Sequence, residues 1–287
     1  MTAMNAASVD KSCAIAVMAK ALRPTHVKTR LVPPLTYESA VTLSASFLRD
    51  ITENISLAAH HAAIRGYVAY APAGHEALFD GILAAGTQLV LADGVVDMPT
   101  RVQGFGRCLL QAAQRLFERG HQSVCLLNSD SPTLPTFVLS QAARALAENG
   151  DRVVLGPADD GGYYVIGVKA PHSHLFEDIT WSTDKVADQT RDRARTLGLE
   201  VLELAPWFDV DNRSSLLRLL RGFMSKTTSG DLPPYAAPET AACVERLRLY
   251  DLLEIDRLFA QPDDLRHANA IASRSHASVK GNPDVDD

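Results

Sequence analysis

The sequence alternates short apolar runs with longer segments whose apolar residues recur at helical spacing. The run from Cys13 to Met18 is apolar throughout, as expected of a strand buried on both faces of a sheet. The segment 36–60 instead places its apolar residues three or four positions apart, which is typical of an amphipathic helix. Repeated alternation of this kind predicts a three-layer α/β/α sandwich around a mostly parallel sheet.

The same patterns predict the order of the elements along the chain. Thr36 with Ser39 marks a helix start, and Gly120 marks a helix end. Strands are predicted at 13–18, 66–71, 87–91, 123–128, 152–156, 163–168 and 199–204. Helices are predicted at 36–60, 75–84, 100–119, 135–148, 183–197, 213–221 and 239–259.

Length and composition limit the function classes. The 287 residues, 46% of them hydrophobic, are enough for a large core, which excludes global disorder. No apolar run reaches the roughly 18 residues of a membrane helix, and the start lacks the pattern of a secretory signal. The net charge of −6 disfavours a general nucleic-acid binder. We therefore expect a cytoplasmic protein with neither a membrane nor a nucleic acid as partner.

Composition also suggests how the chain is divided. We expect a disordered tail at 1–11, one main domain at 12–226, a linker and helix at 227–266, and a second disordered tail at 267–287. The helix after the linker could pack on the main domain or on a second subunit, so a homodimer is possible. The four cysteines show no CxxC spacing, and metal or disulfide roles for them are disfavoured.

Ligands of open parallel sheets bind beyond the carboxyl ends of the strands, and the loop after the first strand is basic there. It carries four cationic residues, which are Lys20, Arg23, Lys28 and Arg30. Arginine grips phosphate oxygens in pairs and lysine acts as a point charge, so the loop could bind a diphosphate. A solvated basic loop is the alternative. No Walker A pattern is present.

Carboxylates follow two other strands. Asp130 ends a buried strand, where it could bind Mg²⁺ or instead form an Asx turn or helix cap. Asp209 and Asp211 alternate, so an extended backbone would direct both toward the same side and complete a divalent site. The alternative is that Asp211 or Asn212 caps the next helix.

A fourth loop, Gly156 to Tyr164, contains two adjacent acids before two glycines. Asp159 and Asp160 could bind sugar hydroxyls or act as a base, whereas Asp-Gly and Gly-Gly pairs are also favoured in hairpin turns. Other catalytic patterns are missing from the sequence. It lacks the HExxH, GxSxG and strand-linked GxGxxG motifs of zinc proteases, α/β-hydrolases and dinucleotide-binding enzymes.

These motifs resemble, in order and spacing, a bacterial family called radical-SAM/selenodomain-associated transferase 1, or domain of unknown function 2064. The resemblance covers about Cys13 to Phe223. Its motifs are Met18-Ala-Lys20, Val27-Lys-Thr-Arg-Leu31, Ser129-Asp-Ser-Pro132, Gly156-Pro-Ala-Asp-Asp-Gly-Gly-Tyr163, Phe176, Trp181-Ser-Thr183 and Asp209-Val-Asp211. The family is similar to GT-A glycosyltransferases and, more distantly, to 2-phospho-lactate guanylyltransferase and the molybdenum-cofactor guanylyltransferases.

The resemblance implies a GT-A fold and assigns roles position by position. Nucleotide binding falls to Lys20, Lys28, Arg30, Ser129 and Asp130. Asp130, Asp209 and Asp211 would bind Mg²⁺ or Mn²⁺. Acceptor chemistry is assigned to Asp159 and Asp160, and substrate contacts to Gly161, Gly162, Tyr163, Trp181 and Ser182.

The sequence also departs from the family pattern. Pro24-Thr-His26 stands where the family usually has a glycine, Ser131 stands for a cysteine, and the segment Gln103 to Arg107 is altered. We expect a metal-dependent glycosyltransferase that uses a nucleoside-diphosphate sugar and a small-molecule acceptor. The alternatives are a nucleotidyltransferase that uses an NTP and releases pyrophosphate, and an inactive nucleotide-binding module.

Overall fold

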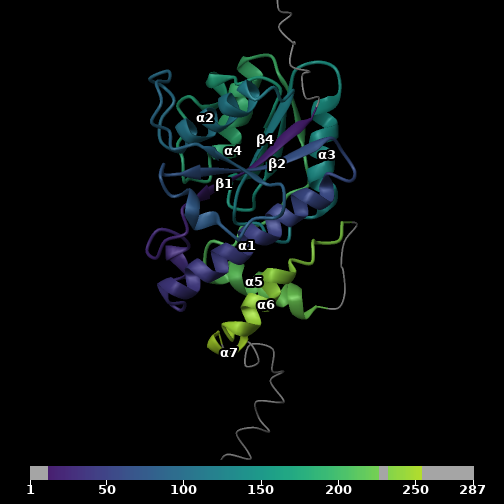
Figure 1. The fold of residues 1–287 in the computed structure, drawn as a ribbon. Coiled ribbons are helices and arrows are strands. Elements are labelled where there is room, and N and C mark those ends of the chain that lie inside the picture. Colours follow the sequence, from purple (N-terminus) through teal and green to yellow (C-terminus); the bar gives the residue numbers. More distant parts are fainter. Residues whose placement is uncertain (1–11, 226–231, 254–287) are drawn as a thin grey trace, which may run out of the picture. The chain divides into compact units, whose positions relative to one another are not determined.

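The computed structural model describes residues 12–225 and 232–253, and these form a seven-stranded sheet with helices on both faces (Figure 1). The strand order is β3-β2-β1-β4-β6-β5-β7. All neighbouring strands pair in parallel except for β6, which is antiparallel to both β4 and β5. The predicted three-layer α/β/α sandwich with a mostly parallel sheet is therefore confirmed.

Each predicted strand is present with nearly the predicted bounds. The strands are β1 (Cys13–Lys20), β2 (Ile64–Ala71), β3 (Gln88–Leu91), β4 (Ser123–Leu127), β5 (Arg152–Pro157), β6 (Tyr163–Val168) and β7 (Glu200–Glu203). Because only β6 is reversed, the carboxyl ends of the other strands meet at one edge of the sheet. The turn that joins β5 to β6 lies at the same edge, which is the edge where ligands of such sheets bind.

The helices divide between the two faces because alternate residues of the central strands point to opposite sides. Ile15 and Val17 of β1 belong to the apolar core under α1 (Tyr37–Ala58) and α3 (Thr136–Ala147). Ala16 and Met18 belong to the core under α2 (Phe105–Glu118) and α4 (Val186–Thr196). The central strands are thus buried on both faces, as their continuous apolar sequence predicts.

The ends of several helices follow from local chemistry. The Thr36 hydroxyl accepts a hydrogen bond from the Ser39 amide at 3.1 Å, which is the predicted cap of α1. Gly120, after α2, has φ of 93° and ends that helix as predicted. The remaining long helix of this part, α5 (Arg213–Met224), is capped by Asn212.

Two helix predictions are wrong. The segment 75–84 forms only a short 3-10 turn, Glu76–Phe79. Asp80 is already extended and Gly81 adopts φ of 72°, so the backbone leaves the helical conformation before the later apolar residues of the segment. The predicted helix 239–259 ends early, as α6 (Pro238–Arg246), and Arg248 has φ of 51° before the short α7 (Leu249–Leu252). Residues beyond 253 lie outside the described part of the chain, as do both predicted tails.

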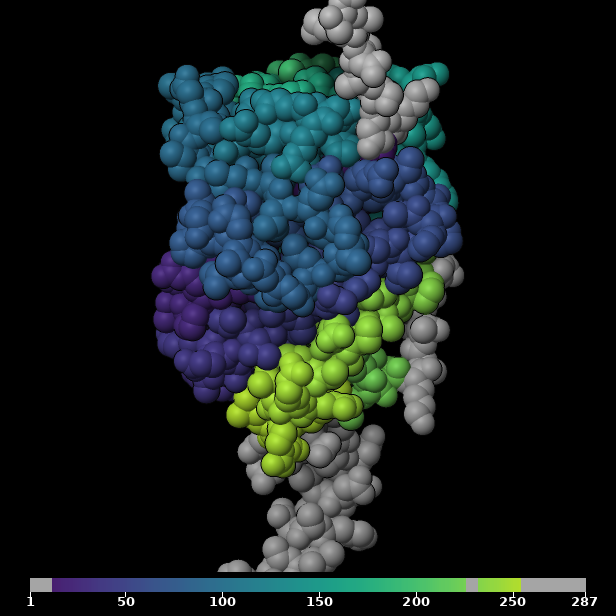
Figure 2. Space-filling view, in the orientation of Figure 1, coloured from purple at the N-terminus to yellow at the C-terminus, as the bar shows by residue number. Residues whose placement is uncertain are grey.

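Helix α6 packs against α1 of its own chain, where Figure 2 shows the yellow-green segment against the violet-blue one. The fully buried Asp50 carboxylate of α1 accepts hydrogen bonds from the amides of Glu239 (3.1 Å) and Thr240 (2.6 Å) in the first turn of α6. This satisfies amides that a helix start otherwise leaves unpaired. The helix thus packs on the main domain, which was one of the two predicted possibilities.

No helix in the described residues is long and apolar enough to cross a membrane.

Candidate functional site

Three loops meet at the carboxyl edge of the sheet and are held together by the segment 207–211. The Val210 amide donates to the Asp130 carbonyl at 2.8 Å, which ties this segment to the loop after β4. The Asp159 amide donates to the Trp207 carbonyl at 3.1 Å, which ties it to the turn after β5. Loops far apart in the sequence are therefore fixed side by side by backbone hydrogen bonds.

Lys28 joins the first loop to this cluster. Its side chain is only 4% exposed, and its ammonium donates to the Val210 carbonyl at 2.7 Å. The same ammonium forms ion pairs with Asp130 and with Asp211, the latter at 3.2 Å. It also lies 5.2 Å from the centre of the Phe47 ring. Two carboxylates predicted from distant loops thus converge on one buried cation.

Asp209 has a different environment from that of its two neighbours. Its Oδ1 accepts hydrogen bonds from Asn128 Nδ2 at 2.6 Å and from Ser131 Oγ at 2.7 Å. Ser131 Oγ also lies 3.1 Å from the Phe208 carbonyl. Asp209 therefore holds the loop after β4 against the segment 207–211, whereas Asp211 faces Lys28.

Burial and mutual repulsion shape the electrostatics of these acids. Burial raises the pKa of Asp209 to about 6, and the charges of Asp130 and Asp211 contribute to that rise. The pKa of Asp211 is also raised, first by burial and then by the charge of Asp130, while Lys28 opposes the change. A cation between the carboxylates therefore relieves an unfavourable concentration of negative charge.

Asp130 and Asp211 keep part of their surface in solvent, 29% and 35% of their side chains. Across residues 12–225 and 232–253, no three His, Cys, Asp or Glu side chains are grouped as a metal site. Mg²⁺ often takes one or two protein carboxylates and completes its shell with water and substrate phosphates. Asp130 and Asp211 lie close together and partly in solvent, so these two could contribute to such a site, although the Lys28 ammonium now lies between them. The predicted third ligand, Asp209, is instead bonded to Asn128 and Ser131.

The sequence left open whether Asp130 forms an Asx turn and whether Asp211 caps a helix, and in both cases a neighbouring asparagine has that role. Asn128, not Asp130, makes the Asx-type contact, since its side-chain oxygen accepts from the Asp130 amide at 3.2 Å. Asn212, not Asp211, caps α5 through the Ser215 amide at 3.0 Å. Both acids are thus available for charge pairing.

The turn from Asp159 to Gly162 joins β5 to β6 as a hairpin. Asp160 Oδ1 accepts from the Gly162 amide at 2.9 Å, and Asp159 forms an ion pair with Arg218 of α5. Gly161 has φ of 86°, and a Cβ atom there would lie 2.2 Å from the Asp184 carbonyl oxygen. The glycine is therefore required both by the backbone conformation and by the close approach of the chain before α4.

The predicted substrate contacts beyond this turn lie in two places. Tyr163 begins β6, and Trp181 and Ser182 lie in the segment before α4. Tyr163 and Trp181 pack against the apolar core under α2 and α4, whereas Ser182 is exposed. The Trp181 ring meets Phe105 edge to face at 5.7 Å between centroids. A Cβ on Gly106 would lie 2.9 Å from Trp181, so the indole is packed tightly against the start of α2.

The other residues predicted to bind a nucleotide border the same edge. Lys20 is the exposed last residue of β1, Arg30 is exposed in the 3-10 turn Thr29–Leu31, and Ser129 Oγ lies 3.2 Å from Asp130 Oδ1. Thr25 has φ of 68°, within the Pro24–His26 stretch that replaces the family glycine. A left-handed β-branched residue costs about 1–2 kcal/mol, which gives the physical reason for a glycine in this loop.

Sequence reasoning missed several residues that build the site. Asn128 and Ser131 fix Asp209, and Arg218 pairs with Asp159 while its guanidinium lies 4.0 Å from the centre of the Phe208 ring. Asn128 adjoins the motif Ser129–Pro132 and Ser131 lies within it, so their position was a usable signal. Arg218 lies within an ordinary amphipathic helix, and only the fold brings it to Asp159.

Comparison with known proteins gives one family match and several structural matches. Residues 54–183 match the family described as an uncharacterised protein conserved in bacteria, domain of unknown function 2064. No curated protein matches the sequence.

Among solved structures, the chain is similar to a candidate nucleotide-diphospho-sugar transferase from Desulfovibrio desulfuricans G20. The identity is 26%, the TM-score is 0.64, and the match covers 82% of this chain and 97% of that chain. CMP:2-keto-3-deoxy-manno-octonic acid synthetase in complex with CTP is 10% identical with a TM-score of 0.46, covering 74% of this chain and 98% of that one. Rv0371c of Mycobacterium tuberculosis H37Rv in complex with manganese is 16% identical with a TM-score of 0.43, covering 74% and 99%.

The first of these matches spans most of both chains, and the family match falls within the segment of the predicted resemblance. Residues 54–183 therefore carry the sequence pattern of the domain of unknown function 2064 family, and the chain has the fold of the nucleotide-diphospho-sugar transferases.

Proposed function

We propose that this protein is a metal-dependent glycosyltransferase that takes its donor from a nucleoside-diphosphate sugar and transfers the sugar to a small-molecule acceptor. The observation that carries the proposal is the buried Lys28 ammonium between Asp130 and Asp211 at the carboxyl edge of the sheet. This edge is where an α/β sheet binds its ligand. The similarity to a candidate nucleotide-diphospho-sugar transferase supports a donor of that class.

The donor side is assigned to the basic loop and the acids. Lys20 and Arg30, both exposed, would bind the phosphate oxygens, where negative charge grows as the diphosphate departs. Lys28 was expected to bind phosphate as well, but its buried ammonium is engaged with Val210, Asp130 and Asp211, so we assign it to positioning the two acids. Asp130 and Asp211 would hold Mg²⁺ or Mn²⁺, which neutralises the diphosphate when bound. Asp209 acts through its neighbours, because its hydrogen bonds to Asn128 and Ser131 keep the loop after β4 in place.

The acceptor side is assigned to the hairpin turn. The acceptor oxygen forms a bond to the anomeric carbon of the sugar, and the bond from that carbon to the diphosphate oxygen breaks with its electron pair. Asp159 or Asp160, both exposed, takes the acceptor proton. Gly161, Gly162, Tyr163, Trp181 and Ser182 would shape the acceptor pocket.

The test identifies the products formed from radiolabelled UDP-, GDP- and ADP-sugars and from NTPs, with Mn²⁺ or with EDTA. We expect a free nucleoside diphosphate and a glycosylated acceptor, and no turnover with EDTA. Pyrophosphate release from an NTP would replace glycosyl transfer with nucleotidyl transfer. No turnover with any donor, together with metal-dependent nucleotide binding by calorimetry, would instead identify an inactive nucleotide-binding module.

A matched pair of variants tests the assignment of the acids. Asp130→Asn should lower turnover by about a hundredfold or more, because one carboxylate of the converging pair is lost. Asp188→Asn, on the exposed face of α4, is the control and should keep normal activity. Electron paramagnetic resonance of Mn²⁺ with nucleotide gives a second readout, since the bound signal should weaken in Asp130→Asn alone. Equal Mn²⁺ binding in both variants would contradict the assigned site.

A further inference from the structure

The loop 128–135 between β4 and α3 carries Asp130, and the C-terminal segment 235–246 is bonded to it. The Thr133 carbonyl accepts a hydrogen bond from the Tyr235 amide at 3.1 Å. Thr133 follows Asp130 closely in the loop, and Tyr235 lies just before α6. The C-terminal segment therefore has a direct backbone contact with the loop that carries a proposed metal ligand.

Helix α1 holds the same loop at the next residue. The Leu134 carbonyl accepts a hydrogen bond from Asn54 Nδ2 at 2.7 Å, and Asn54 Oδ1 accepts one from the Thr136 hydroxyl at 2.6 Å. Asn54 is 2% exposed, so turning its amide would leave buried polar groups unpaired. The Leu134 amide donates to the Ser131 carbonyl at 3.2 Å. This bond closes the loop as a turn, so a shift at Leu134 is transmitted to the residues beside Asp130.

Asp50 determines where the C-terminal segment lies. It is on α1, one turn before Asn54, and its side chain is fully buried. Its Oδ1 accepts from the Glu239 amide and its Oδ2 accepts from the Thr240 amide, both in the first turn of α6. Burial of a carboxylate is costly unless it is hydrogen-bonded, and the first amides of a helix have no partner within the helix. The carboxylate therefore fixes the start of α6 and, with it, the position of Tyr235.

The same face of α1 also contacts Lys28. Phe47, Asp50 and Asn54 are three and four positions apart, so they lie on one face of the helix. Phe47 is fully buried, and its ring centre lies 5.2 Å from the Lys28 ammonium. One helix face thus contacts the cation of the candidate site and, through Asn54, the loop that carries Asp130.

We propose that Asp50 is a positioning residue of the candidate site. It docks the segment 235–246, and this segment holds the loop 128–135 so that Asp130 keeps its place in the site. The assignment rests on the proposed function, since it concerns an acid that would hold the metal ion of the donor. Asp50 and the C-terminal segment both lie outside residues 54–183, so the family pattern does not include this contact.

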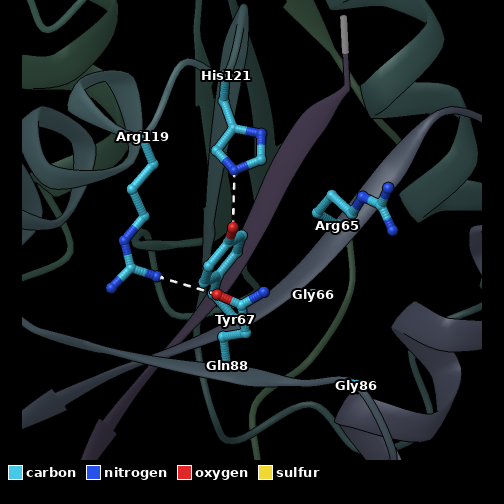
Figure 3. A pocket seen from close by; sticks show the side chains of 7 residues that line it. All are labelled: Arg65, Gly66, Tyr67, Gly86, Gln88, Arg119 and His121. Atoms are coloured by element: carbon cyan, nitrogen blue, oxygen red, sulfur yellow. Dashed lines mark hydrogen bonds between the residues drawn. The ribbon is translucent and has the colours of Figure 1, made fainter. Parts of the chain in front are cut away.

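The test compares two substitutions that each remove a buried hydrogen bond. Asp50→Asn replaces one accepting oxygen with an amino group that cannot accept from an amide of α6. Tyr67→Phe is the control, because it removes the bond of 2.8 Å between the Tyr67 hydroxyl and His121 Nε2. Figure 3 shows this bond in a pocket at the amino ends of the strands, whereas Asp130 follows the carboxyl end of β4.

Hydrogen exchange of the full chain, followed by NMR, measures the position of the loop without any substrate. The reporter is the Val210 amide, which donates to the Asp130 carbonyl at 2.8 Å. The amides of β1 report global unfolding and serve as the internal reference. Relative to that reference, the Val210 amide should exchange about tenfold faster or more in Asp50→Asn and at the unmodified rate in Tyr67→Phe.

Steady-state kinetics with the donor that the unmodified chain uses gives the second readout. Asp50→Asn should lower kcat by about tenfold or more, because a small displacement of Asp130 misplaces the metal ion. The KM for the acceptor should be unchanged, since the acceptor contacts are assigned to the hairpin turn. Tyr67→Phe should keep both constants of the unmodified chain.

Equal relative exchange of the Val210 amide in Asp50→Asn and Tyr67→Phe would overturn the proposal. So would an equal loss of kcat in the two variants, which would indicate a general effect of stability. If the unmodified chain turned over no donor while Val210 still exchanged faster in Asp50→Asn alone, the proposed reaction would be rejected and the positioning of Asp130 supported.

Discussion

Replacing Lys28 with methionine tests the central interaction of the candidate site. Methionine keeps most of the apolar stem but removes the ammonium, which lies 5.2 Å from the centre of the Phe47 ring. Asp130 and Asp211 would then share a partly buried site without a counter-charge. We therefore expect the substitution to destabilise the fold even without any ligand.

The magnitude follows from the geometry. At an effective dielectric constant of about 20, unit charges 3.2 Å apart, as for Lys28 and Asp211, attract by roughly 5 kcal/mol. Burial of the ammonium offsets part of this attraction, and the partly exposed carboxylates regain some solvation when the lysine is removed. Breaking one side of a buried ion pair costs about 3–5 kcal/mol, and we expect about 3 kcal/mol here.

The measurement is urea unfolding followed by circular dichroism at pH 8 in 150 mM salt. Lys185→Met, at an exposed position before α4, is the control and should change stability by less than about 0.5 kcal/mol. The double variant Lys28→Met with Asp130→Asn should recover about 1 kcal/mol relative to Lys28→Met, because the repulsion between the two acids is gone. Mg²⁺ should also stabilise Lys28→Met by binding to the two carboxylates that have lost their counter-charge.

The reasoning would be refuted if Lys28→Met had the same stability as Lys185→Met. It would also be refuted if the double variant were less stable than Lys28→Met by the full cost of Asp130→Asn alone. In that case the three charges would contribute independently, and the convergence of Asp130 and Asp211 on Lys28 would have no energetic consequence.

Two further predictions concern the fold. Gly156→Ala should destabilise the protein by about 2–3 kcal/mol, because its Cβ would lie 2.3 Å from Cζ of the fully buried Tyr164 ring. A Cβ atom on Gly222 of α5 would have no atom within 4 Å, so Gly222→Ala should stabilise the protein by about 0.5–1 kcal/mol. Equal effects of Gly156→Ala and Gly222→Ala in chemical denaturation would contradict the steric argument. Burial raises the pKa of Asp50 in the folded chain, so the folded state binds a proton more tightly than the unfolded state. The contribution of this carboxyl to the free energy of unfolding should therefore fall as pH rises through its folded pKa. The difference in thermal stability between the native chain and Asp50→Asn should shrink over the same pH range. If that difference grew with pH in parallel thermal melts, the argument would be contradicted.

The sequence by itself determined the layers of the fold. The continuous apolar run of β1 requires burial on both faces, and the helical spacing of α1 requires burial on one face only. Together these requirements specify a sheet of buried strands covered by helices. Local signals also determined several ends, such as the Thr36 cap and the Gly120 stop, because such hydrogen bonds and backbone conformations involve residues adjacent in the chain. The early end of the last helix was not predicted, since the apolar pattern continues past Arg248 while its backbone adopts φ of 51°.

Only the tertiary structure decided the partners within the candidate site. The sequence predicted cations in the first loop and acids after two strands, but Asp209 and Asp211 look equivalent along the chain. The structure directs Asp209 to Asn128 and Ser131 and directs Asp211 to Lys28, a residue 183 positions away. Hydrophobic periodicity reports only which side of an element is buried, whereas charge pairing depends on strand order and on the loops that this order places together.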